Sequence, residues 1–170
     1  MKTTSVKLYS LPYNEAKTYW VTILFIMGNV IFPRLCHLFP QGGITWLPIY
    51  FFTLVGAYKY GWKVGLLTAV FSPTINSLFF GMPLPAALPV VLMKSVGLAA
   101  IAGWCAHRFK HISLPILIFV VFSYQFIGIW GEWLLMKDFF RAVQDFRIGL
   151  PGIGLQVFGG YLFIKHLINK

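Results

Sequence analysis

The chain has 170 residues, of which 58% are hydrophobic and only 11% are charged, and its net charge is +10. Soluble domains carry about 25% charged residues, so this composition excludes an ordinary soluble domain and indicates an integral membrane protein. The positive charge is then best explained by membrane topology and contact with lipid headgroups, and we expect no nucleic-acid partner. We expect one membrane domain over residues 1–170, beginning with a polar segment over residues 1–14 that contains no removable signal peptide.

Six apolar segments approach the length of a membrane-spanning helix, which needs about 20 residues to cross a hydrocarbon core about 30 Å thick. In chain order they cover residues 16–38, 44–58, 61–80, 85–106, 112–136 and 150–168. Turn-forming residues separate them, as in Pro40-Gln41-Gly42-Gly43 and Gly149-Leu150-Pro151-Gly152. The sequence therefore predicts an all-α integral membrane bundle of six transmembrane helices, of which the second is the shortest.

The distribution of lysine and arginine predicts the orientation, because such residues are enriched on the cytoplasmic side. With both termini cytoplasmic, the inner segments hold nine of the 14 basic residues and the outer segments hold four. The remaining one, Lys94, lies within the fourth span. We therefore expect a multi-pass protein of the cell membrane with both termini inside.

Lys94 lies about ten residues into the fourth span, which would place it about 15 Å deep. A lysine at that depth costs about 2.5 kcal/mol or more unless it faces a partner, a polar cavity or a ligand. Asn76 lies about five residues before the turn at Gly81, and Ser72 precedes it by one helical turn on the same face.

Further polar and aromatic side chains lie at a matching depth in other spans. Gln125 and Glu132 share one face of the fifth span, with Tyr124 beside them, and Trp46 and Tyr50 lie one turn apart at the start of the second. Together they predict a small-molecule pocket that opens to the outside. The predicted substrate-binding residues are Lys94, Asn76, Ser72, Trp46, Tyr50, Gln125, Glu132 and Tyr124.

Structural alternatives remain open for the same residues. Lys94 and Glu132 could form a buried ion pair with each other rather than contact a ligand. Asn76 and Gln125 could form interhelical hydrogen bonds, which are common in membrane bundles and are worth about 0.6–2 kcal/mol. Trp46 could belong to the aromatic belt at the membrane interface.

The sequence contains no pattern typical of a catalytic or metal site. There is no HExxH, no GxSxG and no phosphate-binding loop, and the chain holds only four acidic residues. Cys36 and Cys105 lie far apart and do not have metal-ligand spacing. We therefore expect a protein that is not an enzyme, with no cofactor and no bound metal.

Two sets of small or flexible residues suggest a gate and a docking surface. Glycines permit the backbone changes that a lid requires, so the loops containing Gly42, Gly43, Gly81, Met82 and Pro83 are expected to gate the pocket. Small residues at four-residue spacing let another helix approach closely, which predicts that a partner docks there or that the span packs on its own neighbours. These residues are Ala57, Gly61, Gly65 and Ala69.

The stretch "ITWLPIYFFTLVGAYKYGWKVGLLTAVFSPTINSLFFGMPLPAALPVVLMKSVGLAAIAGW" resembles the substrate-binding S components of energy-coupling factor vitamin transporters. The shared features are the Leu-Pro entry to the second helix, the glycine-spaced turn into the third, and a Ser-Pro and Gly-x-Pro segment before the fourth. The resemblance covers residues 43–104, and beyond them only the topology. It implies a bundle that captures a small water-soluble vitamin or precursor from outside and topples in the membrane to release it, together with a transmembrane coupling protein and two cytoplasmic ATPases.

Two positions depart from that family's pattern. Its first helix often carries an Ala-x-x-x-Ala contact motif, whereas here Ala16 is followed four residues later by Trp20. Lys94 stands where many relatives would have a neutral or acidic residue, which points to an anionic ligand. Two other functions remain open, namely a non-transporting structural subunit or scaffold and a solitary small secondary carrier, although no internal repeat is evident.

Overall fold

The computed structural model describes residues 8–168, apart from the side chains of Met136, Arg141, Asp145, Leu167 and Ile168. All the regular secondary-structure elements in this part of the chain are helices. They are α1 (Ala16–Cys36), α2 (Gly42–Trp46), η1 (Pro48–Tyr50), α3 (Phe51–Tyr60), α4 (Trp62–Phe80), α5 (Leu88–Phe109), α6 (Leu114–Met136), α7 (Phe139–Ile148), α8 (Leu150–Gly154), the π-helical turn η2 (Leu155–Gly159) and α9 (Gly160–Ile168).

Four of the described helices, α1, α4, α5 and α6, are long and apolar enough to cross a membrane. A fifth candidate is the pair formed by residues 142–148 and 150–166, which is bent by 59°. The prediction of an all-helical, multi-pass membrane bundle is confirmed at this level, with four or five candidate spans among the described residues instead of six.

The second expected span, residues 44–58, is not one helix. Leu47 adopts a left-handed conformation with φ of 47°, and Pro48 follows it at the start of η1. Proline lacks the backbone N–H that a continuing helix requires and disfavours helical geometry in the residue before it, so the chain turns here. Only the ten residues of α3 follow, a helix about 15 Å long that is too short to span a bilayer.

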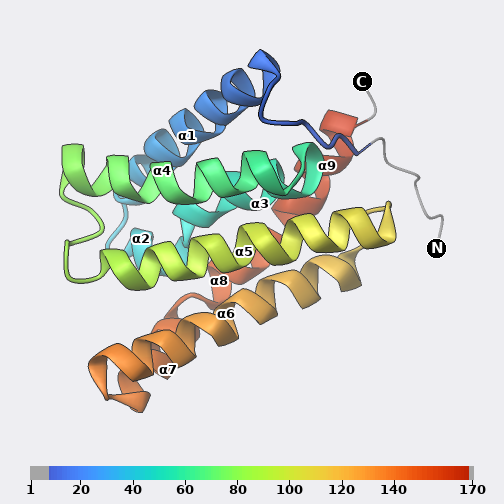
Figure 1. The fold of residues 1–170 in the computed structure, drawn as a ribbon. Helices are drawn as coiled ribbons and strands as arrows, with labels where there is room; N and C mark the ends of the chain where they lie inside the picture. Colours follow the sequence, from blue (N-terminus) through green and yellow to red (C-terminus); the bar gives the residue numbers. More distant parts are fainter. Residues whose placement is uncertain (1–7, 169–170) are drawn as a thin grey trace.

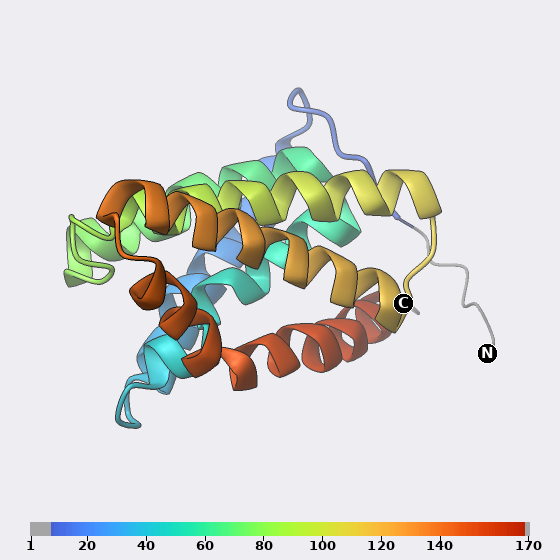
Figure 2. The same cartoon turned by 90° about the horizontal axis from the view of Figure 1, so that it is seen from below.

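The short helix α3 lies at the centre of the fold. Eight of its ten residues are buried, and it packs against α1, α4, α5 and α9. Figure 1 shows α4, α5 and α6 side by side, and Figure 2 shows α9 on the opposite side of α3 from α4 and α5. This short apolar segment is therefore a core helix that the other helices surround.

The bundle has two distinct ends. One end, which we call the α7 end, carries α2, the α4–α5 connection over residues 81–87, and α7 (Figure 1). The opposite end carries the α3–α4 turn, the α5–α6 connection and the segment before α1, where the Tyr9 N–H donates to the Lys59 carbonyl at 2.9 Å. The C-terminal end of α9 lies at this opposite end as well.

The start of α5 changes the depth expected for Lys94. Residues 85–87 form a turn, so α5 begins at Leu88 rather than Pro85. Lys94 is then six residues, about 9 Å, from the beginning of its helix instead of about 15 Å. The lysine therefore lies in the part of the bundle nearer the α7 end, and not at its middle.

Candidate functional site

The most unusual feature of the interior is an ion pair between two long apolar helices. Lys94 Nζ of α5 lies 3.2 Å from Glu132 Oε2 of α6, and each residue is only 7% exposed. It is the only ion pair among the described side chains. The alternative in which these two residues contact each other is thus the arrangement in the structure.

Glycines on α6 leave room for the side chains of α5 at this lysine. A Cβ atom at Gly128 would collide with the aliphatic stem of Lys94, and one at Gly131 would collide with the end of Met93. Lys94 therefore lies across the α6 backbone at Gly128 and reaches Glu132, which is one helical turn further along. The flexible stem rests on glycine while the ammonium group meets the carboxylate.

A second polar cluster joins α6 to the π-helical turn η2. The Tyr124 hydroxyl donates to Gln156 Oε1 at 2.8 Å, and Gln125 Nε2 donates to the Tyr124 hydroxyl oxygen at 3.2 Å. Gln156 Nε2 in turn donates to the Leu47 carbonyl at 3.4 Å, and the Tyr50 ring lies 5.3 Å from that of Tyr124. The predicted residues Tyr50, Tyr124 and Gln125 are therefore brought together.

Gln156 is a site residue that the sequence analysis missed. It is fully buried and belongs to η2, a type of turn that is rare and often occurs at functional sites. It is an amide within the expected span 150–168, so the criterion that selected Asn76 would have found it. Its partners could not have been foreseen, because the π turn shifts the faces that α8 and α9 present to the bundle.

A third polar cluster holds α1, α3 and α4 together. Asn29 Nδ2 donates to Thr53 Oγ1 and to Ser72 Oγ, both at 3.0 Å, while Asn29 Oδ1 accepts from the Phe52 N–H at 3.2 Å. Asn76 Nδ2 donates to the Asn29 carbonyl at 3.0 Å and to the Ser72 carbonyl at 2.9 Å. The interhelical alternative for Asn76 is confirmed. Asn29 was missed although it is an amide within the first expected span.

Trp46 does not belong to any of the three polar clusters. Its side chain is 39% exposed and lines an apolar cavity of about 450 Å³ at the α7 end. The other lining residues are Phe32, Leu35, Cys36, Phe39 and Leu155. Its neighbour Leu47 nevertheless contacts Gln156 through the carbonyl, so this segment touches the second cluster by its backbone.

The residues expected to gate the pocket lie in two connections at the α7 end. A Cβ atom at Gly42 would collide with the Cys36 carbonyl and one at Gly43 with the His37 ring, so α2 folds tightly back on the end of α1. Gly81 ends α4 with φ of 67° and has open space around it, and Met82 is 55% exposed before Pro83. The first connection is closely packed and the second is open.

The small residues expected to dock a partner are turned inward. Ala57 and Ala69 are fully buried, and a Cβ atom at Gly65 would collide with Ala57. Gly61 has φ of 101° and lies against the backbone of residues 9–11. The four-residue spacing therefore serves the close packing of α3 on α4, which is the internal alternative.

One buried polar atom in the described part of the chain has no hydrogen-bond partner. It is Ser95 Oγ, which follows Lys94 in α5 and is fully buried. The same residues provide no cluster of three His, Cys, Asp or Glu side chains that could hold a metal ion. The functional groups in the two clusters around α6 are one ammonium, one carboxylate, one phenol and two amides.

In comparisons with known proteins, the chain matches no family model, no curated protein and no solved structure. Its function must be inferred from the site itself.

Proposed function

We propose that this protein binds a small water-soluble vitamin or vitamin precursor in the membrane and serves its uptake as the S component of an energy-coupling factor transporter. The single observation that carries the proposal is the buried ion pair between Lys94 and Glu132, at 3.2 Å. Charged residues within membrane-spanning segments are costly, and they commonly mark substrate or ion sites. The resemblance of residues 43–104 to that family supplies the transport role.

The clusters around α6 have groups suited to a small polar ligand. Lys94 would bind an anionic group such as a carboxylate, and Glu132 would accept a hydrogen bond from a donor on the same molecule. Tyr124, Gln125 and Gln156 would orient its neutral part, since phenols and amides can both donate and accept. Few convergent polar groups in an otherwise apolar interior are typical of small-molecule sites.

Transport would require other subunits, because the sequence has no phosphate-binding loop with which to use ATP. The proposed partners are a transmembrane coupling protein and two cytoplasmic ATPases, with the protein in the cell membrane and both termini inside. The α2 segment and the 81–83 turn would cover the site from outside, since both lie at the α7 end.

The proposal is tested on protein purified in mild detergent. Small molecules released by denaturation are identified by mass spectrometry, and the affinity of the released compound is then measured by isothermal titration calorimetry. We expect one compound in near-stoichiometric amount and saturable binding after its removal. A protein that releases no such compound, and that shows no saturable binding to a panel of water-soluble vitamins and their precursors, would contradict the proposal.

A structural scaffold is the second candidate, and one observation favours it. The polar groups of Asn29, Ser72 and Asn76 are hydrogen-bonded to one another or to backbone, and Lys94 is paired with Glu132. Buried polar residues that satisfy each other can stabilise a bundle without any ligand. The scaffold predicts a stable, monodisperse protein that releases no bound compound.

A further inference from the structure

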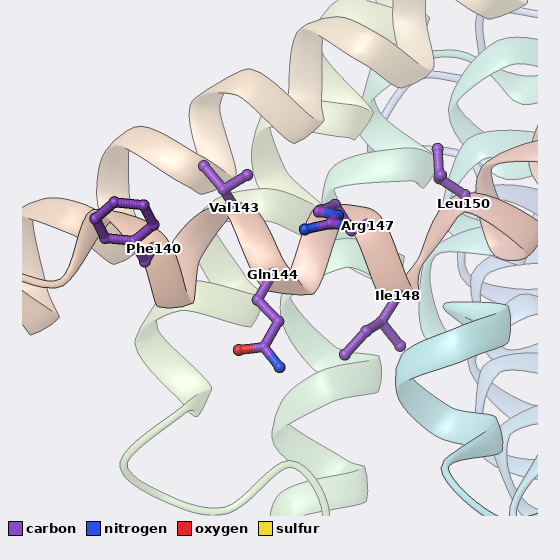
Figure 3. Close-up of a pocket in the computed structure, with 6 residues that line it drawn as sticks. All are labelled: Phe140, Val143, Gln144, Arg147, Ile148 and Leu150. Atoms are coloured by element: carbon purple, nitrogen blue, oxygen red, sulfur yellow. The ribbon is translucent and has the colours of Figure 1, made fainter.

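We propose that the groove over α7 is a binding site for the headgroup of an anionic phospholipid. The groove has a volume of about 640 Å³ and lies on the outer face of α7 and its junction with α8 (Figure 3). Its lining residues are Phe140, Val143, Gln144, Arg147, Ile148 and Leu150. The groove is separate from the Lys94 cluster and does not depend on the function proposed above.

A bend in the chain shapes this groove. Residues 142–148 and 150–166 meet at an angle of 59°, with Gly149 between them. Five of the lining residues belong to α7, and Leu150 belongs to the beginning of α8. In Figure 3, Val143 and Leu150 project to one side of the α7 backbone and Gln144 and Ile148 to the other, with Arg147 between them.

Arg147 supplies the charge in the groove. Its side chain is exposed, and no carboxylate described by the structure forms an ion pair with it. A guanidinium group binds phosphate through two parallel hydrogen bonds, and arginine is for this reason favoured in phosphate recognition. The amide of Gln144, three residues earlier and also in the groove, can donate to an ester or phosphate oxygen.

The position of α7 favours a lipid over a soluble anion. The last turns of α6 and the start of α7 expose several aromatic rings, and such rings are enriched where membrane-spanning helices meet the headgroups. Trp130 is 61% exposed, Trp133 40% and Phe139 52%. The ring of Trp133 lies between the other two, with centroid distances of 5.7 Å to Trp130 and 6.1 Å to Phe139.

The mixed character of the lining matches an amphiphile. Four of the six lining residues, Phe140, Val143, Ile148 and Leu150, are apolar. An inorganic anion would leave them uncovered, whereas the first acyl carbons of a phospholipid would cover them while the phosphate meets Arg147. Phosphatidylglycerol has both the negative charge and the acyl chains, so it is the probe of choice.

The experiment compares lipid retention by native mass spectrometry on the full chain purified from vesicles of phosphatidylcholine and phosphatidylglycerol. We expect wild type to retain phosphatidylglycerol in preference to phosphatidylcholine, and Arg147→Gln to bind it about tenfold more weakly, as for loss of one charge-assisted contact. Arg34→Gln is the matched control, because Arg34 lies at the α7 end but stacks on the Phe80 ring at 3.5 Å. The Arg34→Gln protein should retain as much phosphatidylglycerol as wild type.

Three outcomes would overturn the proposal. The first is that wild type shows no preference for phosphatidylglycerol, a result that is independent of whether any variant folds. Arg147→Gln, eluting as a folded monodisperse protein, could retain the lipid as wild type does. Excess inorganic phosphate could displace the lipid completely, which would identify a site for a soluble anion instead.

Discussion

Removing one member of the Lys94–Glu132 pair should destabilise the protein far more than removing both. At 3.2 Å and an effective dielectric constant of about 20, the attraction between the two charges is about 5 kcal/mol. Desolvation offsets much of this in the intact pair, but a single substitution removes this attraction and leaves the other charge buried. Lys94→Met should therefore lower the free energy of unfolding by about 3–5 kcal/mol, and Glu132→Met by a similar amount.

The double variant Lys94→Met/Glu132→Met should recover most of that loss, because apolar residues of similar volume replace a buried ion pair at little net cost. The assay is reversible unfolding in mixed micelles, followed by near-ultraviolet circular dichroism for all four proteins of the cycle. Arg108→Met provides the control, since Arg108 is an exposed basic residue near the other end of α5. Its effect should stay within about 0.5 kcal/mol.

If wild type carries a compound, the same variants separate the two roles open to the ion pair. If the pair only holds α5 to α6, the double variant should retain whatever compound wild type carries. If the pair is the ligand site, the double variant should be stable but empty. Should Lys94→Met prove as stable as wild type, with the same bound compound, then neither the ion pair nor a role for Lys94 in binding could be maintained.

Two further predictions concern packing and the third polar cluster. Gly65→Ala should cost about 1–3 kcal/mol of unfolding free energy, because the added methyl group would overlap Ala57. Gly154→Ala, which has open space around its Cβ position, should be neutral or slightly stabilising in the same assay. Asn29→Leu should lower the midpoint of thermal unfolding strongly, because it removes the hydrogen bonds to Thr53 Oγ1 and to the Phe52 N–H on α3, at about 1–3 kcal/mol each. Unchanged unfolding of either Gly65→Ala or Asn29→Leu would contradict the packing described here.

The long helices were predictable from the sequence because length and hydropathy are sufficient signals for them. The expected segments 16–38, 61–80 and 112–136 agree with α1, α4 and α6 to within about two residues at each end. The segment 85–106 is displaced by three residues at each end, because residues 85–87 form a turn before α5 begins.

The shorter elements could not be predicted in the same way. Whether Leu47-Pro48 enters a helix or breaks one depends on the conformation of Leu47, which hydropathy does not report. The helix α7 was expected to be part of a loop, because its apolar residues are interspersed with Arg141, Asp145 and Arg147. A search for continuous apolar segments passes over an amphipathic helix of this kind.

The sequence draws attention to these polar residues, but which of them lie together is known only from the structure. Depth alone placed Ser72 and Asn76 beside Lys94, whereas the helix faces separate them. Ser72 and Asn76 bond to α1, while Lys94 pairs with α6. A sequence without related sequences beside it does not show which faces of the helices meet.

This grouping decides which of the clusters could admit a ligand. Asn29 and Asn76 bond to backbone atoms of α3, α1 and α4, so opening that cluster would require three helices to separate. The contact between Lys94 and Glu132 is instead made by two side chains, with the stem of Lys94 resting on Gly128. A ligand bound at this pair would therefore compete with a side-chain contact and not with hydrogen bonds to the backbone. Under the proposed function, binding should perturb the resonances or exchange rates of α5 and α6 near Lys94 and leave those of α1 near Asn29 unchanged, and the reverse pattern would place the ligand elsewhere.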